Sequence, residues 1–184
     1  MLEENKRKWA LKLTLLGDAA VGKTSLIRKY VTGTFSQDYQ PTLGVDITIK
    51  DIILEEINSE VRLIFWDIAG QSKYELTRKM FFQGCAGTLL VYDVTRSSTF
   101  ESITSKWFDD FKKYGRADGV CLLIGNKIDM NDSIKVQSEN GKKLSSELNA
   151  ADFIETSAKY GENVEKAFKK LVFSVLKNYG VKII

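Results

Sequence analysis

One glycine-rich segment near the start of the chain limits the fold and the chemistry more than any other feature. Its residues are Gly17, Asp18, Ala19, Ala20, Val21, Gly22, Lys23, Thr24 and Ser25. They match the spacing G-x-x-x-x-G-K-[ST], which is typical of a loop that surrounds a polyphosphate. An apolar run over 11–16 predicts a strand before the segment, and residues 25–31 predict a helix after it. Taken alone, the segment could also be an ordinary glycine-rich turn.

The strand–loop–helix order explains how such a segment would bind phosphate. Successive backbone N–H groups of the loop and the positive end of the helix together form an anion site. Lys23 adds a mobile positive charge for the outer phosphates, and the Thr24 hydroxyl is placed to ligate Mg²⁺. The sequence therefore predicts a phosphate site in this loop, with a divalent cation beside it.

The composition excludes several other classes of site. The chain has 184 residues and no histidine, so Ser-His-Asp catalysis, Cys-His catalysis and histidine-based metal sites are ruled out. Its length predicts a single domain over 1–184. The net charge of +3 is small, and no basic stripe is interleaved with aromatic residues, so binding to nucleic acid is not expected.

The sequence also shows no signal for a disulfide or a membrane span. Cys85 and Cys121 lie in or near apolar segments without a CxxC pair, which predicts buried free thiols in a reducing compartment. No apolar run reaches the length of a membrane span, Leu2 precludes N-myristoylation, and the chain as given has no terminal cysteine for prenylation. We expect a monomeric, cytoplasmic protein without a membrane anchor in this chain. Peripheral association with a membrane would then require a further tail or a partner.

Apolar runs of strand length alternate with helix-like runs along the rest of the chain. Strands are expected over 45–54, 61–67, 88–92, 120–124 and 153–154, and helices over 100–111, 138–149 and 164–176. A short polar turn joins the strands over 45–54 and 61–67, which allows an antiparallel hairpin. This alternation predicts an α/β fold with a mostly parallel sheet, helices on both faces, and a ligand at the carboxyl ends of the strands.

A carboxylate, a glycine and a glutamine follow the strand over 61–67. Asp67, at the end of the strand, is placed to hold Mg²⁺ through a water molecule. Gly70 allows a backbone N–H to approach a terminal phosphate, and the Gln71 carboxamide can both donate to and accept from an attacking water. By itself, an aspartate followed by a glycine is also common where a strand ends in a turn.

A second polar motif, at 126–129, follows the strand over 120–124. The Asp129 carboxylate can accept two hydrogen bonds from guanine, from N1–H and from the exocyclic amine, whereas adenine lacks this pair of donors. Lys127 can lay its aliphatic stem along the base, and Asn126 is suited to connecting this loop with the phosphate loop. A solvated turn remains the alternative for this motif alone.

A third motif follows the strand over 153–154 and consists of Ser157, Ala158 and Lys159. Small residues there would let a backbone N–H reach the guanine carbonyl, and the lysine can cover the ring. Each motif is weak on its own. Because all of them occur at strand ends and in the order that one site needs, their joint interpretation is a guanine-nucleotide site.

The set of motifs resembles the Ras superfamily of small GTPases. The segments GDAAVGKT, DIAGQ, NKID and TSAK carry this resemblance over almost the whole chain, and WDIAGQ and LVYDVT are most similar to the Rab family. The resemblance implies a P-loop NTPase fold, the small G domain, with six strands, one of them antiparallel, and five helices. By matched position, Thr42 would ligate Mg²⁺ and sense the γ-phosphate, Phe35 would pack against the guanine, and Tyr39 would close over the phosphates.

The resemblance also implies the function of a GTP/GDP switch with slow GTPase activity. In that function, Gln71, Lys23 and Thr42 would serve catalysis, and Thr24, Thr42 and Asp67 would hold Mg²⁺. Effectors, exchange factors and GTPase-activating proteins would bind at the two nucleotide-sensing segments, in Rab-like membrane trafficking or in signalling.

Two alternatives and one departure accompany this expectation. A nucleotide-bound scaffold with little or no hydrolysis is the main alternative. A P-loop ATPase or kinase is disfavoured by Asp129, whose carboxylate suits guanine. Ala19 stands where family members often carry glycine or serine, and we hypothesise that its methyl group slows hydrolysis.

Overall fold

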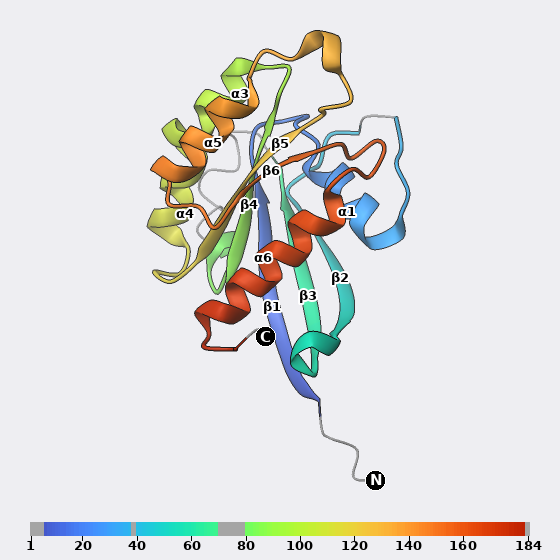
Figure 1. The fold of residues 1–184 in the computed structure, drawn as a ribbon, viewed down its shortest axis with the longest axis vertical. Coiled ribbons are helices and arrows are strands. Elements are labelled where there is room, and N and C mark those ends of the chain that lie inside the picture. Colours follow the sequence, from blue (N-terminus) through green and yellow to red (C-terminus); the bar gives the residue numbers. More distant parts are fainter. Residues whose placement is uncertain (1–5, 38–39, 70–79, 183–184) are drawn as a thin grey trace.

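The computed structural model describes residues 6–37, 40–69 and 80–182. Its strands are β1 (Arg7–Leu16), β2 (Val45–Leu54), β3 (Ser59–Ile68), β4 (Gly87–Asp93), β5 (Val120–Asn126) and β6 (Phe153–Thr156). They form one sheet in the order β2-β3-β1-β4-β5-β6, with helices on both sides (Figure 1). Only β2 runs antiparallel to its neighbour among the described strands, because β2 and β3 form a hairpin. The predicted α/β fold and the predicted hairpin are confirmed.

The described helices are α1 (Lys23–Thr32), α3 (Ser97–Ser102), α4 (Asp109–Tyr114), α5 (Ser138–Glu147) and α6 (Val164–Asn178), with a π-helical turn over Ile103–Phe108 and 3₁₀ turns over Glu55–Ile57 and Asn131–Ser133. The helix expected over 100–111 therefore begins earlier and is interrupted by the π-helical turn. Ile103, Trp107 and Phe111 nevertheless lie on one face and are all buried. Within the described ranges, none of the helices has both the length and the apolar composition that a membrane span needs.

Two hydrophobic cores hold the helices against the sheet. On one face, α1 and α6 pack through residues such as Leu26 and Phe168 against side chains of β1 and β3. On the other face, the helical segment from 97 to 114 and α5 pack through Trp107 and Leu144. All residues of β4 are buried, as expected for a strand covered on both faces. The layers leave the carboxyl ends of the parallel strands open for a site.

The strand β2 forms one edge of the described sheet. Ile47, Ile49 and Ile53 alternate along it and remain 48%, 55% and 58% exposed. Asp51 lies in the same row, and its carboxylate accepts hydrogen bonds from Nε and Nη2 of Arg62 on β3, at 2.8 and 2.9 Å. The outer row of this edge strand is therefore apolar, with one ion pair within it.

Candidate functional site

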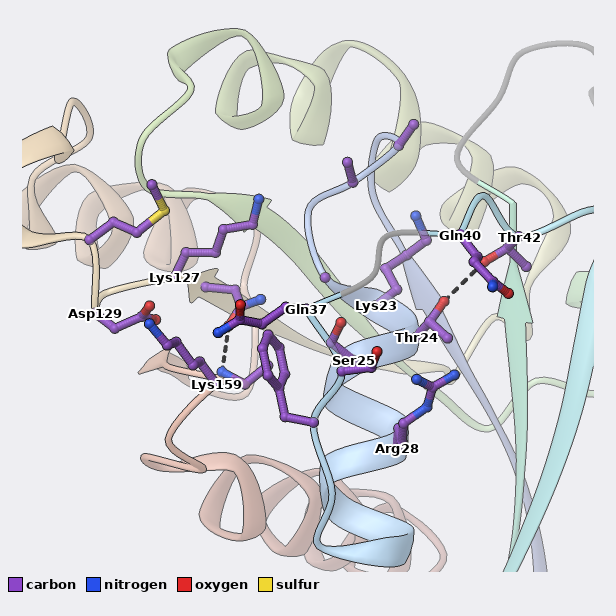
Figure 2. Close-up of a pocket in the computed structure, with 18 residues that line it drawn as sticks. Lys23, Thr24, Ser25, Arg28, Gln37, Gln40, Thr42, Lys127, Asp129 and Lys159 are labelled. Atoms are coloured by element: carbon purple, nitrogen blue, oxygen red, sulfur yellow. Dashed lines mark hydrogen bonds between the residues drawn. The ribbon is translucent and has the colours of Figure 1, made fainter.

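The segments that follow β1, β5 and β6 meet at the carboxyl ends of these parallel strands. They line a cavity of about 750 Å³, a size typical of small-molecule sites. It is lined by Ala19, Ala20, Gly22, Lys23, Thr24, Ser25, Arg28, Phe35, Ser36, Gln37, Gln40, Thr42, Asn126, Lys127, Asp129, Met130, Ala158 and Lys159. Figure 2 shows Lys23 and Thr42 toward one end of the cavity and Asp129 toward the other. The residues predicted for phosphate and for base thus lie along one cavity.

Two glycines of the loop at 17–24 occupy positions that no other residue fits. A Cβ atom at Gly17, where φ is +151°, would lie 2.1 Å from the carbonyl oxygen of Val91. At Gly22, with φ +102°, it would lie 2.3 Å from Nδ2 of Asn126. Both positions need the backbone freedom and the missing side chain of glycine, so the spacing of the motif follows from the packing of this loop.

The side chain of Lys23 lies across the same loop. It is only 6% exposed, and its Nζ donates to the carbonyl oxygens of Gly17 and Asp18, at 2.8 Å each. Burial lowers the pKa of Lys23 to about 8, although the negative charges of Asp67 and Asp18 act to raise it. The loop thus holds a cation at the start of α1, where the helix dipole already favours an anion.

Three oxygen-bearing side chains from three segments converge beside Lys23. Thr24 Oγ1 lies 2.9 Å from Thr42 Oγ1, and it donates to Oδ2 of Asp67. The other carboxylate oxygen, Oδ1, is buried and has no hydrogen-bond partner among the described residues. Burial raises the pKa of Asp67, although the bond from Thr24 and the charge of Lys23 act in the opposite direction. A hard divalent cation with retained waters fits this set of oxygens and would supply a partner for the orphaned Oδ1.

Asn126 joins the two halves of the cavity. Its side chain is 1% exposed. Nδ2 donates to the carbonyl of Val21 at 2.9 Å, and Oδ1 accepts from Thr156 Oγ1 at 3.0 Å and from the Ala158 N–H at 3.2 Å. The predicted connection between the loop at 126–129 and the phosphate loop is therefore present, and it extends to the segment after β6.

The far end of the cavity carries the acidic group predicted to select the base. Asp129 Oδ1 accepts a hydrogen bond of 2.6 Å from Ser157 Oγ, which fixes the orientation of the carboxylate. Phe35 and Lys159 line the cavity. Phe35 also packs against the core that contains α1 and α6, so an aromatic ring and a lysine stem are both available for the faces of a planar ligand.

The predicted binding residues divide into three groups. Those that line the cavity are Ala19, Ala20, Gly22, Lys23, Thr24, Ser25, Phe35, Thr42, Asn126, Lys127, Asp129, Ala158 and Lys159. A second group lies behind this lining and contacts it through hydrogen bonds, namely Gly17, Asp18, Val21, Asp67 and Ser157. Tyr39, Gly70 and Gln71 lie outside the described residues, so their roles stay predictions.

Sequence reasoning missed several residues that line the cavity, namely Arg28, Ser36, Gln37, Gln40 and Met130. Arg28 had a usable signal, because it lies one helical turn after Thr24 and therefore on the same face of α1. Gln37 and Gln40 had none, because they belong to the polar segment between α1 and β2, whose path no periodicity specifies.

Asp93, at the end of β4, is a buried polar centre. It lies within the segment LVYDVT, which served only for the family resemblance and gave this carboxylate no role. Its carboxylate accepts hydrogen bonds from Thr95 N–H and Oγ1 at 2.9 and 2.7 Å, and from Arg96 Nε at 3.0 Å. Lys127 Nζ lies 2.7 Å from the same carboxylate. Burial alone would raise the pKa of Asp93, but the bonds from Lys127 and Thr95 lower it overall. Asp93 thus fixes the lysine that lines the cavity.

Comparison with known proteins agrees with this geometry. The model of the Ras family matches residues 12–177. The chain is 39% identical over 160 residues to "Ras-related protein Rab-1" of Theileria annulata, an alignment that covers 87% of this chain and 71% of that protein. A "Ras-related protein Rab-1" of Theileria parva is 38% identical over the same shares. "Ras-related protein RABA5e" of Arabidopsis thaliana is 33% identical over 180 residues, which are 98% of this chain and 81% of that protein. The chain therefore belongs to the Ras family and is a Rab-like small GTPase.

Proposed function

We propose that this chain binds GDP or GTP together with Mg²⁺ in the cavity of Figure 2 and hydrolyses GTP slowly to GDP and phosphate. The observation that carries the proposal is the arrangement of three features along one cavity. They are a carboxylate for the base, a buried lysine at a helix N-terminus, and the hydroxyls of Thr24 and Thr42 with the Asp67 carboxylate behind them. Each matches a different part of a guanine nucleotide, and their order along the cavity matches the order of those parts.

Base selection rests on Asp129. Its carboxylate would accept hydrogen bonds from N1–H and the exocyclic amine of guanine, while Ser157 Oγ donates a further hydrogen bond to Oδ1. With adenine in the site, this carboxylate would be left without donors. Such a mismatch can weaken the binding of the wrong base by a factor of about 10⁴–10⁵. The stem of Lys127 and Lys159 would cover the ring, and Phe35 would pack edge-on against it. The Ala158 N–H, which donates to Asn126, would share its hydrogen with the guanine carbonyl.

Phosphate binding rests on the loop at 17–25 and on Lys23, whose ammonium would exchange the carbonyls of Gly17 and Asp18 for phosphate oxygens. Thr24, Thr42 and Asp67 would hold Mg²⁺, Asp67 through water. Bound there, the cation would neutralise charge on the phosphate oxygens.

Hydrolysis in this proposal is the in-line attack of water on the γ-phosphorus, which breaks the bond to the β–γ bridging oxygen and releases phosphate. Gln71 would orient the water, and the Gly70 N–H and Lys23 would stabilise the charge that develops on the phosphoryl oxygens. Because a carboxamide can both donate to and accept from the water, Gln71 needs no shifted pKa to orient it. Tyr39 and Thr42 would close over the γ-phosphate and be released after hydrolysis, which is how such loops signal.

The same proposal covers the partners. Effector, exchange-factor and GTPase-activating proteins would bind the segments that sense the γ-phosphate, and the relatives' Rab names support a role in membrane trafficking. The chain would act as a monomer in the cytoplasm, with membrane contact through a tail or a partner.

The first experiment identifies the nucleotide in purified protein and measures its release. We expect bound GDP or GTP, release on chelation of Mg²⁺ by EDTA, and displacement of a fluorescent GDP by GTP but not by ATP. Equal displacement by ATP would refute base selection by Asp129. Single-turnover hydrolysis of GTP by wild type and Gln71→Leu then separates a GTPase from a nucleotide-bound scaffold, since a scaffold would show no turnover in either protein.

A further inference from the structure

An arginine outside the sequence motifs contacts the phosphate loop. Arg96 stands just before α3, in the segment that follows β4. Its Nε donates to Asp93 at 3.0 Å, and its Nη2 donates to the carbonyl oxygen of Ala19 at 3.0 Å. Because Lys127 binds the same carboxylate at 2.7 Å, one chain of charged contacts runs from Lys127 at the base end through Asp93 and Arg96 to the phosphate loop.

The carbonyl that Arg96 binds belongs to the peptide group between Ala19 and Ala20. Ala20 has φ of +61°, in the left-handed region that costs an L-residue free energy because of its Cβ. A flip of this peptide group would change ψ of Ala19 and φ of Ala20, and it would return Ala20 to the region that L-residues prefer. The local backbone preference of this chain therefore opposes the observed orientation, in which the Ala19 carbonyl accepts from Arg96 and the Ala20 N–H, trans to that carbonyl, points the opposite way.

Contacts with Arg96 and Trp107 oppose such a flip. Trp107 Nε1 donates to Asp18 Oδ1 at 2.9 Å, which fixes the residue before Ala19. Arg96 holds the Ala19 carbonyl through its Nη2. The position of Arg96 is itself fixed by the nearly fully buried carboxylate of Asp93. A cation on the carbonyl also polarises the peptide group and so strengthens the Ala20 N–H as a donor.

We propose that Arg96 is a positioning residue that holds the Ala19–Ala20 peptide in the phosphate-binding orientation and thereby slows the release of nucleotide. The proposal rests on the proposed function, because it concerns release from the same cavity. The Ala20 methyl group makes this support necessary. A glycine at position 20 would tolerate the left-handed conformation without it.

The test measures the dissociation rate of fluorescent GDP, in excess unlabelled GDP and Mg²⁺, for wild type, Arg96→Met, Ala20→Gly and the double variant. With the native Ala20 in place, Arg96→Met should raise the rate about tenfold, as expected from the loss of one hydrogen bond to a charged group. In the Ala20→Gly background, the same substitution should raise it less than about threefold, because glycine carries no penalty for the left-handed conformation.

Arg62→Met is the matched control, because it removes an arginine with two bonds to Asp51 on the outer face of the sheet. It should leave the dissociation rate unchanged. If Arg96→Met does not give folded protein, Arg96→Gln replaces it in the same comparison, with the same pattern expected at smaller amplitude.

The outcomes separate this inference from the function on which it rests. If the wild type retains GDP but Arg96→Met releases it no faster, the inference is overturned. It is also overturned if the substitution has the same effect with alanine and with glycine at position 20, since Arg96 would then support the fold in general. If the wild type itself binds no guanine nucleotide, the proposed function fails and the inference with it.

Discussion

The buried side chain of Asn126 allows a quantitative test of how the cavity is held together. In Asn126→Ala, the Val21 carbonyl, the Thr156 hydroxyl and the Ala158 N–H each lose a hydrogen bond of 2.9 to 3.2 Å. A buried polar group left unpaired costs about 1–3 kcal/mol, so three such groups lower the free energy of unfolding by at least ~3 kcal/mol. This is a large share of the ~5–15 kcal/mol that stabilises a typical domain.

Two further variants provide a scale for this loss in the free energy of unfolding. Thr156→Val keeps the shape of the side chain and removes one of the bonds, so it should cost about 1 kcal/mol. Asn178→Ala removes an amide that donates to the Asp118 carbonyl at an exposed position, and exposed substitutions of this kind usually change the free energy of unfolding by about 0.5 kcal/mol or less. The expected order of destabilisation is therefore Asn126→Ala, then Thr156→Val, then Asn178→Ala.

The assay is urea-induced unfolding, followed by circular dichroism at one fixed excess of GDP and Mg²⁺. Because bound ligand adds RT ln(1 + [L]/Kd) to the free energy of unfolding, Kd for GDP is measured for each variant and this contribution is subtracted. If Asn126→Ala then lies within about 1 kcal/mol of the wild type, or no lower than Asn178→Ala, the three bonds do not stabilise the fold as argued.

Three other perturbations test separate parts of the argument. Gly17→Ala forces a Cβ to 2.1 Å from the Val91 carbonyl oxygen. We expect urea unfolding to show that the free energy of unfolding falls by at least about 2 kcal/mol. An unchanged midpoint would contradict the packing of this loop. Burial raises the pKa of the Cys121 thiol to about 11, so native protein at pH 8 should react with iodoacetamide at least about 100-fold more slowly than urea-unfolded protein, and the native rate should rise with pH toward that pKa. Fast alkylation of the native protein, located at Cys121 by mass spectrometry, would refute its burial. Asp129→Asn loses the charge that accepts from guanine, and displacement of fluorescent GDP should report an affinity at least about tenfold weaker; an unchanged affinity would remove Asp129 from the base site.

The sequence was sufficient for the order of elements and for most of the cavity, for reasons visible in particular residues. Buried runs such as those of β4 and β5 are readable because both faces of the strand are covered. The loop at 17–25 is readable because its glycines are required by close backbone contacts, as at Gly22. Boundaries were less accurate: β1 extends back to Arg7, and β3 begins at Ser59 rather than at Val61. In both extensions the strands pair through backbone hydrogen bonds. Such pairing does not require a particular side-chain pattern, so the sequence gives little sign of it.

The network around Asp93 could not be predicted in the same way. Asp93, Arg96 and Lys127 come from two different strand ends, and the contact with Ala19 joins residues 77 positions apart. An isolated arginine after a strand has no spacing that marks it, and its role appears only when the fold brings its guanidinium to a particular carbonyl. The π-helical turn over Ile103–Phe108, which carries Trp107 to Asp18, likewise has no signature in the helical periodicity.

The isoleucine row of β2 has a consequence for the behaviour of the protein in concentrated solution. An edge strand with a flat apolar row is a template for pairing with another chain, and natural sheets interrupt such rows with charge. Here Asp51, paired with Arg62, stands between Ile49 and Ile53 and has the position of a gatekeeper. Resistance to aggregation thus depends on a surface carboxylate that contributes little to folding. A neutral residue in place of Asp51 should cause self-association before it causes loss of structure, whereas a substitution of Arg62 leaves the charge in the row.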